Sequence, residues 1–119
     1  MMLDDDVMAE VEEGMEFVSR APKLMDVLEA VCAVYRIGKM DLMSFRRFSH
    51  FVEARDAFYW CAKTFTPRSY PEIGRFLADR DHSSVWEGVM RAQIRFDSHK
   101  QRLVLVAKRL GVAVDEVQQ

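Results

Sequence analysis

The chain has 119 residues, of which 50% are hydrophobic and three are prolines. This length suffices for one compact domain, and the composition excludes a disordered or low-complexity chain. The formal charge of −2 points to neither a nucleic-acid nor a membrane partner, but it hides an asymmetry. Residues 1–30 carry nine acidic and two basic side chains, a charge of −7, whereas residues 31–119 carry a charge of +5. We therefore expect a basic body with an acidic arm.

Cysteine, histidine and targeting signals exclude several classes of function. Cys32 and Cys61 lie in apolar stretches without a CxxC pair, and the three histidines stand at no metal-ligand spacing. We expect two reduced core thiols, no metal and no cofactor. No apolar run approaches the roughly 18 residues of a membrane span, and the N-terminus is acidic rather than basic. The sequence therefore predicts a cytoplasmic protein without a membrane partner.

The first half of the chain predicts helices. Apolar residues recur at helical spacing, and no apolar–polar alternation is long enough for a strand, so we predict an all-α bundle. A short acidic helix is predicted over 5–19, with a boundary at Pro22. A helix then runs to near Gly38, and a single turn over 41–44 precedes the basic pair Arg46-Arg47. A longer helix is predicted over about 49–65.

The second half predicts three more helices with recognisable caps. Ser69 stands three residues before Glu72, a capping box for a short helix over 70–77. Asp81 can cap a helix from His82 to about Phe96, and a last helix over 98–110 stops at Gly111. Trp60 and Trp86 are predicted to be core or helix-interface anchors rather than platforms for base stacking.

The helices over 70–77 and 82–96, joined by a tight loop, form a candidate helix-turn-helix. The second helix opens with four polar residues, Asp81-His82-Ser83-Ser84. A recognition helix needs polar residues there, because its N-terminal turn enters the major groove. The alternative is that Asp81 and Ser84 are only caps and His82 is an exposed bystander. A hydrolase triad is excluded, because adjacent helical residues point about 100° apart; no catalytic set remains.

Two motifs then make the sequence resemble a known family. Ser69-Tyr70-Pro71-Glu72-Ile73-Gly74 and Arg80-Asp81-His82-Ser83-Ser84-Val85 correspond to S-x-P-E-I-G and R-D-H-[ST]-T-V at the family's separation. Upstream, Asp41-Leu42, Ser44 and Arg46-Arg47 match D-L-x-S-x-[KR]-R. Residues 31–96 thus resemble the C-terminal DNA-binding domain (domain IV) of the bacterial replication initiator DnaA. This resemblance implies a small bundle with a helix-turn-helix of the Trp-repressor-like kind, and a bacterial, nucleoid-associated protein.

The resemblance also implies roles for individual residues. The segment that reads the DnaA box in the major groove corresponds to Arg80, Asp81, His82, Ser83 and Ser84. Arg47 is expected to enter the adjacent minor groove, where negative potential favours a guanidinium group. The residues expected to hold phosphates are Arg55, Lys63, Tyr70 and Pro71. Gly74 is expected to permit close packing of the two helices.

The chain also departs from the family pattern. Glu53-Ala54 stands where the family usually has Arg-Pro, which places an acid where it would face phosphates or lose a contact. Ala78-Asp79 replaces a glycine pair in the inter-helix loop and is expected to stiffen it. Phe45 and Phe48 flank the arginine pair; they either cover an extra terminal helix or present an apolar contact to the groove.

We predict three parts: an acidic extension over 1–21, the domain IV-like domain over 22–97, and a C-terminal helix and tail over 98–119. The phosphate-cradling G-x-x-x-x-G-K-[ST] loop does not occur in this sequence, so we expect a stand-alone domain without a nucleotide site. Two functions are compatible with these features. The first is sequence-specific binding of double-stranded DNA at DnaA-box-like sites, in replication control or transcription regulation. The second is a protein-interaction module that kept the fold; residues 1–21 and 98–119 are candidates for a protein partner or homodimer contact.

Overall fold

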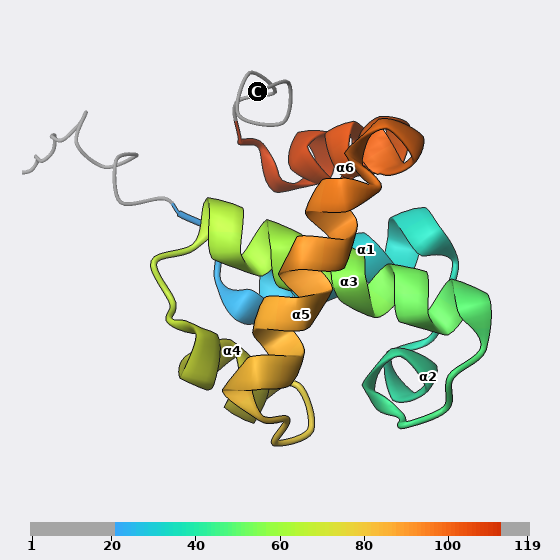
Figure 1. Ribbon diagram of the computed structural model, residues 1–119. Helices are drawn as coiled ribbons and strands as arrows, with labels where there is room; N and C mark the ends of the chain where they lie inside the picture. The colour runs from blue at the N-terminus through green and yellow to red at the C-terminus, as the bar shows by residue number, and fades with distance from the viewer. Residues whose placement is uncertain (1–20, 113–119) are drawn as a thin grey trace, which may run out of the picture.

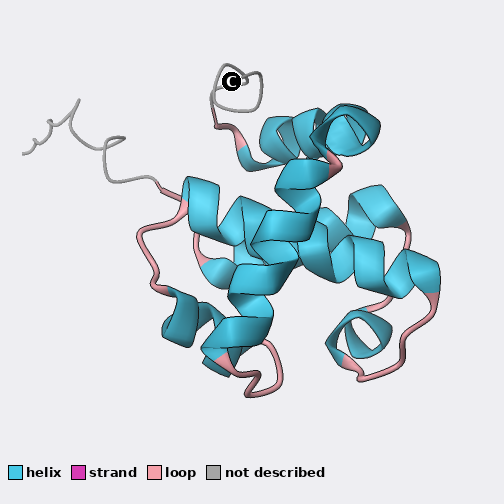
Figure 2. Ribbon diagram, in the orientation of Figure 1, coloured by secondary structure: helices cyan, strands magenta, loops and turns pink. Residues whose placement is uncertain are grey.

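The computed structural model describes residues 21–112, so the acidic helix predicted over 5–19 lies outside the described residues. The described residues form six helices and no strand, and Figures 1 and 2 show their arrangement. In chain order they are α1 (Leu24–Tyr35), α2 (Lys39–Met43), α3 (Ser49–Phe65), α4 (Tyr70–Phe76), α5 (His82–Ile94) and α6 (Phe96–Leu110). The all-α prediction is confirmed, and α3 has the predicted bounds.

The central element is α3, against which α1, α4 and α5 pack. Every residue from Ala54 to Ala62 is buried, because other helices cover this stretch on all sides. Phe58 is fully buried, and its ring stacks on Phe76 of α4 with the centroids 6.0 Å apart. In Figure 1, α5 crosses α3 at a steep angle, with α4 beside the N-terminal half of α5. The scaffold thus fixes α5 from two sides.

The last helix, α6, packs on α1 and completes the core. It begins at Phe96 rather than at the predicted Ser98, because the chain bends at Arg95 and Phe96 packs on Trp60, 5.9 Å between ring centroids. Leu103, Val106 and Ala107 are fully buried. The helix ends, as predicted, at Gly111, which has a φ of +75° that favours glycine.

The two tryptophans have different environments. Trp60 is 6% exposed, and its indole Nε1 donates to Gln93 Oε1 at 3.0 Å, so its prediction as an anchor is confirmed. Trp86 is 49% exposed, so its assignment to the core or a helix interface is wrong. The buried stripe of α5 contains Val85, and the next residue is rotated by about 100° around the helix. That rotation turns Trp86 outward.

The two cysteines are free thiols. Cys61 is buried, as predicted, and burial raises the pKa of its thiol; Cys32 is only half-buried. None of the helices formed by residues 21–112 is long and apolar enough to cross a membrane. The same residues contain no cluster of His, Cys, Asp and Glu that could hold a metal ion.

Candidate nucleic-acid interface

The turn between α4 and α5 is built around Gly74. The backbone N–H of Arg80 donates to the Gly74 carbonyl at 2.7 Å. A Cβ atom at position 74 would lie 2.1 Å from the Arg80 carbonyl oxygen, so only glycine permits this approach. The expected role of Gly74 in close packing is confirmed. Ala78 and Asp79 complete the turn with φ values of +58° and +54°, in the left-handed region where glycine is favoured.

Both helices of this pair begin with the predicted caps. At α4, the Ser69 side chain accepts a hydrogen bond from the Glu72 backbone N–H, and Glu72 Oε1 accepts from the Ser69 N–H at 2.9 Å. At α5, Asp81 Oδ2 accepts from the Ser83 N–H at 2.9 Å. These hydrogen bonds lower the pKa of Glu72 and of Asp81, because each stabilises the ionised carboxylate. The capping predictions for both helices are therefore confirmed.

The first turn of α5 is presented to solvent. Asp81, His82, Ser83 and Ser84 are all exposed, whereas the next residue, Val85, is fully buried. The second carboxylate oxygen of Asp81 lies 3.7 Å from His82 Nδ1. Because the cap uses only one carboxylate oxygen of Asp81, the turn offers an acceptor, an imidazole and two hydroxyls on a rigid backbone.

Two arginines hold the loop that carries Arg47. Arg55 of α3 donates from Nε to the Leu42 carbonyl at 2.8 Å and from Nη2 to the Arg46 carbonyl. Arg80 donates to the carbonyls of Met43 and Ser44. Four carbonyl groups of the segment 42–46 are thereby bound by guanidinium groups. The loop backbone is fixed relative to both α3 and the helix-turn-helix.

The side chains of Arg55 and Arg80 are bound to the loop and are wholly or partly withdrawn from solvent. Arg55 is 6% exposed, and burial together with the nearby Arg80 lowers the pKa of its guanidinium. Its donors are directed at the loop, so in this structure it orients the loop instead of facing solvent. Arg80 is half-buried, and its guanidinium lies 4.5 Å from the centroid of the Phe45 ring. The sequence did not predict the hydrogen bonds of Arg55 and Arg80 to the loop carbonyls, because each joins residues nine or more positions apart.

The loop and the first turn of α5 border one hollow of about 330 Å³. Arg47, Asp81 and Ser84 line it, and Arg47 is exposed. Below them the carboxylate of Asp56, 3% exposed, pairs with Arg91 of α5 through two hydrogen bonds of 2.9 and 3.0 Å. This pair joins α3 to α5, so the hollow has a rigid floor. The structure thus brings Arg47 to the same hollow as Arg80, Asp81 and Ser84, whereas His82 and Ser83 do not line it.

The remaining predicted residues gather elsewhere, where α3 ends and α4 begins. Lys63 is exposed, and its Nζ lies 4.6 Å from the centroid of the Tyr70 ring. Pro71 is exposed in the first turn of α4. The structure therefore supplies a second polar group, separate from the hollow, at the N-terminus of α4.

The structure shows the surroundings of two departures from the family pattern, Glu53 and the pair Phe45 and Phe48. Glu53 points toward α6, where its Oε1 lies 3.9 Å from Arg102 Nη1. Phe45 and Phe48 are 73% and 55% exposed. Phe48 precedes α3, and its ring packs edge-to-face with Phe51 of that helix, with the centroids 5.3 Å apart. Both rings are exposed within the described part of the chain, and the predicted N-terminal helix that they could cover lies outside it, so both alternatives stay predictions.

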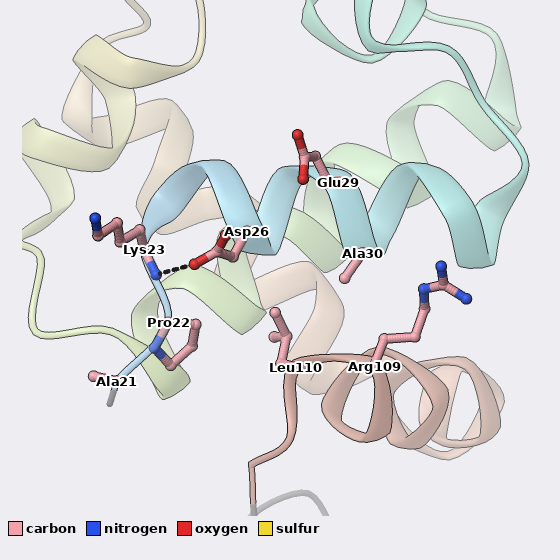
Figure 3. Close-up of a pocket in the computed structure, with 8 residues that line it drawn as sticks. All are labelled: Ala21, Pro22, Lys23, Asp26, Glu29, Ala30, Arg109 and Leu110. Carbon is pink, nitrogen blue, oxygen red and sulfur yellow. Dashed lines mark hydrogen bonds between the residues drawn. The ribbon is translucent and has the colours of Figure 1, made fainter. Parts of the chain in front are cut away.

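A larger hollow of about 510 Å³ lies between the start of α1 and the end of α6 (Figure 3). Side chains of both charges line it: the basic residues Lys23 and Arg109 and the acidic residues Asp26 and Glu29. Asp26 Oδ2 accepts from the Lys23 N–H at 2.9 Å, which caps α1. None of the predicted site residues lines it.

Comparison with known proteins identifies the family. The family described as bacterial DnaA protein helix-turn-helix matches residues 24–92, which include α1 to α4 and most of α5. The chain belongs to this family. It is 40% identical over 91 residues to the chromosomal replication initiator protein DnaA of Sphingopyxis alaskensis, covering 75% of the chain and 19% of that protein. Against the initiator of Rhizobium meliloti it is 33% identical over 93 residues, covering 76% of the chain and 19% of the relative.

Membership in a DnaA helix-turn-helix family implies that the chain binds DNA. The chain spans about a fifth of the length of these initiators, since the matches cover 19% of each. Helix α6 begins at Phe96, beyond the residues matched by the family. The resemblance stated from the two motifs is therefore confirmed, and the capped, exposed turn of α5 is the second of those motifs.

Proposed function

We propose that the protein binds double-stranded DNA in a sequence-specific manner at DnaA-box-like sites, in replication-initiation control or transcription regulation. The observation that carries this proposal is the position of Arg47 beside the exposed first turn of α5, across one hollow. A recognition helix and a neighbouring basic loop can engage the major groove and the adjacent minor groove at the same time.

In the proposed complex, the N-terminal turn of α5 lies in the major groove. His82 contacts a thymine methyl group or a base acceptor, and the hydroxyls of Ser83 and Ser84 reach base edges or phosphates. Asp81 keeps its cap and uses its second oxygen to accept from cytosine N4. This use of Asp81 is compatible with its capping role, because the two hydrogen bonds involve different oxygens.

Arg47 enters the minor groove next to that major-groove segment. The segment 42–46 that precedes Arg47 is held by the carbonyl contacts of Arg55 and Arg80, so less conformational freedom of the loop is lost on binding. We therefore assign Arg55 a positioning role in place of a direct phosphate contact. Arg80 contributes to DNA binding in two ways: it holds the same loop, and it lies directly before the recognition helix.

Phosphate contacts come from the second polar group. Lys63 supplies a charge, and Tyr70, the first residue of α4, supplies a backbone N–H; Pro71 lies beside this contact and, having no backbone N–H, donates nothing to the phosphate. Contacts of this kind fix the register of the protein on the duplex and carry no sequence information directly. They set the salt dependence of binding, because each neutralised phosphate releases counterions.

The first test is a fluorescence-anisotropy titration of a DnaA-box duplex and a scrambled duplex, each at two salt concentrations. We expect clear preference for the box duplex. Equal, salt-sensitive affinity for both duplexes would refute box specificity and leave DNA as the partner. Absence of binding to either duplex at low salt would refute the proposal and favour a protein-interaction module.

Single variants then test the roles. Arg47→Ala and His82→Ala should each weaken box binding by about 1–3 kcal/mol, the usual value of a lost base contact. Lys63→Ala should weaken binding to both duplexes alike and reduce the salt slope by about one. Lys108→Ala removes an exposed lysine on α6 and is the matched control, which should leave both affinities unchanged. A change of sequence preference in Lys63→Ala would contradict this orientation of the domain.

A further inference from the structure

The outer surface of α5 carries an aromatic residue that the assignments above leave unused. Trp86 is 49% exposed, in contrast to Trp60, which is 6% exposed and packs on Phe65 and Phe96. Exposure of half a tryptophan leaves a large apolar surface in water, which is unfavourable unless a partner covers it.

The position of Trp86 along the helix relates it to the reading turn. It follows His82 by four residues and Ser83 by three, so all three lie on one face of α5. At 100° per residue, Trp86 projects about 40° around the axis from His82 and about 60° from Ser83. A helix that places its first turn in the major groove therefore carries Trp86 along the same groove, about 6 Å further along its axis.

We propose that Trp86 extends the reading surface by one turn and recognises the C5-methyl group of a thymine through apolar contact in the major groove. This inference rests on the proposed function, since it requires α5 to lie in that groove. Double-stranded DNA is the occupant favoured here, because Trp86 adjoins the exposed polar turn of the same helix.

The chemistry of the major groove supports a methyl group as the target. The thymine C5-methyl is the apolar group that a base pair presents there, beside hydrogen-bond donors and acceptors. An indole ring offers a large apolar face and only one N–H donor. Covering a methyl group with that ring removes both surfaces from water without leaving a polar base edge unpaired.

The test changes one methyl group at a time. Deoxyuridine differs from thymidine by loss of the C5-methyl and keeps its Watson–Crick hydrogen bonds. Binding of the wild-type protein is measured by anisotropy on the DnaA-box duplex and on copies in which single thymines are replaced. We expect at least one replacement to weaken wild-type binding about fourfold, the factor for burial of a methyl-sized group. The thymine contacted by Trp86 is distinguished from one contacted by His82 because only its replacement loses its effect in the Trp86 variant.

The variant Trp86→Ala should lose affinity for the unmodified duplex and become insensitive to replacement of that one thymine. Trp86→Phe should keep part of the sensitivity, because a phenyl ring is also an apolar contact. Ile94→Ala is the matched control: Ile94 is 83% exposed on the same helix, about 12 Å further along the axis, and should leave the replacement pattern unchanged. Thermal unfolding followed by circular dichroism verifies that each variant is folded.

The outcomes separate the two proposals. If the wild-type protein prefers the box duplex but Trp86→Ala is as sensitive as wild type to every replacement, the role of Trp86 is overturned and the proposed function stands. If the wild-type protein shows no preference for the box, both proposals fail.

A fluorescence measurement gives an independent readout, since the chain has two tryptophans and one is buried. Saturation with the box duplex should protect wild-type emission from quenching by acrylamide and have little effect in Trp86→Phe. Equal protection in both proteins would contradict burial of Trp86 against DNA.

Discussion

Replacement of Ala78 by glycine should stabilise the protein. Ala78 has a φ of +58°, in the region where a Cβ atom meets the following carbonyl oxygen. A glycine has no Cβ and adopts this conformation at no steric cost. The turn that Ala78 helps to form is held by the Arg80 N–H donating to the Gly74 carbonyl, so its backbone has little freedom to relax.

The magnitude follows from two opposing effects. An L-residue in the left-handed region costs roughly 1–2 kcal/mol, and glycine removes that cost. Glycine also loses more conformational entropy on folding, roughly 0.5–1 kcal/mol relative to alanine. The expected gain is therefore about 0.5–1 kcal/mol, which raises Tm by about 2–8 °C for a domain of this size.

Urea unfolding of wild type and Ala78→Gly measures the difference directly. The control is Ala33→Gly, the same substitution at an exposed helical position of α1, which should destabilise by about 0.5–1 kcal/mol. An Ala78→Gly variant that is less stable than wild type by a similar amount would refute the left-handed conformation at position 78.

Three further predictions concern the turn between α4 and α5, the N-cap of α5, and the loop that carries Arg47. Gly74→Ala should destabilise by at least about 2 kcal/mol in urea unfolding, because its Cβ would meet the Arg80 carbonyl oxygen. The pKa of Asp81 is lowered in the folded protein, so its contribution to stability is present at neutral pH and lost as pH falls below about 4. Asp81→Asn keeps a capping oxygen without the charge, so its Tm should fall less than that of wild type between pH 7 and pH 3; an equal fall would contradict this assignment. Arg55→Met should weaken box binding by about tenfold with the salt slope unchanged, whereas a slope reduced by about one would identify a direct phosphate contact.

The capped starts of α4 and α5 and the end of α6 were predictable because local chemistry decides them. Ser69 and Asp81 have side-chain oxygens that each accept from one backbone N–H in the first turn of the helix that follows, α4 or α5. Gly111 can adopt the left-handed conformation that ends α6. Each of these signals depends on a few neighbouring residues, so it can be recognised in the sequence without knowledge of the tertiary structure.

The features that sequence reasoning missed depend on contacts between distant residues. The break between α5 and α6 at Arg95 has no proline or glycine to mark it, and it is set by packing of Phe96 on Trp60. The sequence around Arg55 shows only a basic residue in a helix, compatible with phosphate binding. Its burial follows from the carbonyl groups that the 42–46 segment turns toward α3.

Arg80 explains how the parts of the interface are connected. Its backbone N–H closes the turn on Gly74, and its guanidinium binds carbonyls of the loop 36 and 37 residues earlier. One residue therefore links the start of the recognition helix to the loop that carries Arg47. Because the guanidinium is planar and its donors point in fixed directions, it holds these carbonyl groups in one arrangement, which a lysine could not reproduce. The spacing between the proposed major-groove and minor-groove contacts is thus set inside the protein before DNA binds, which lowers the entropy lost on binding.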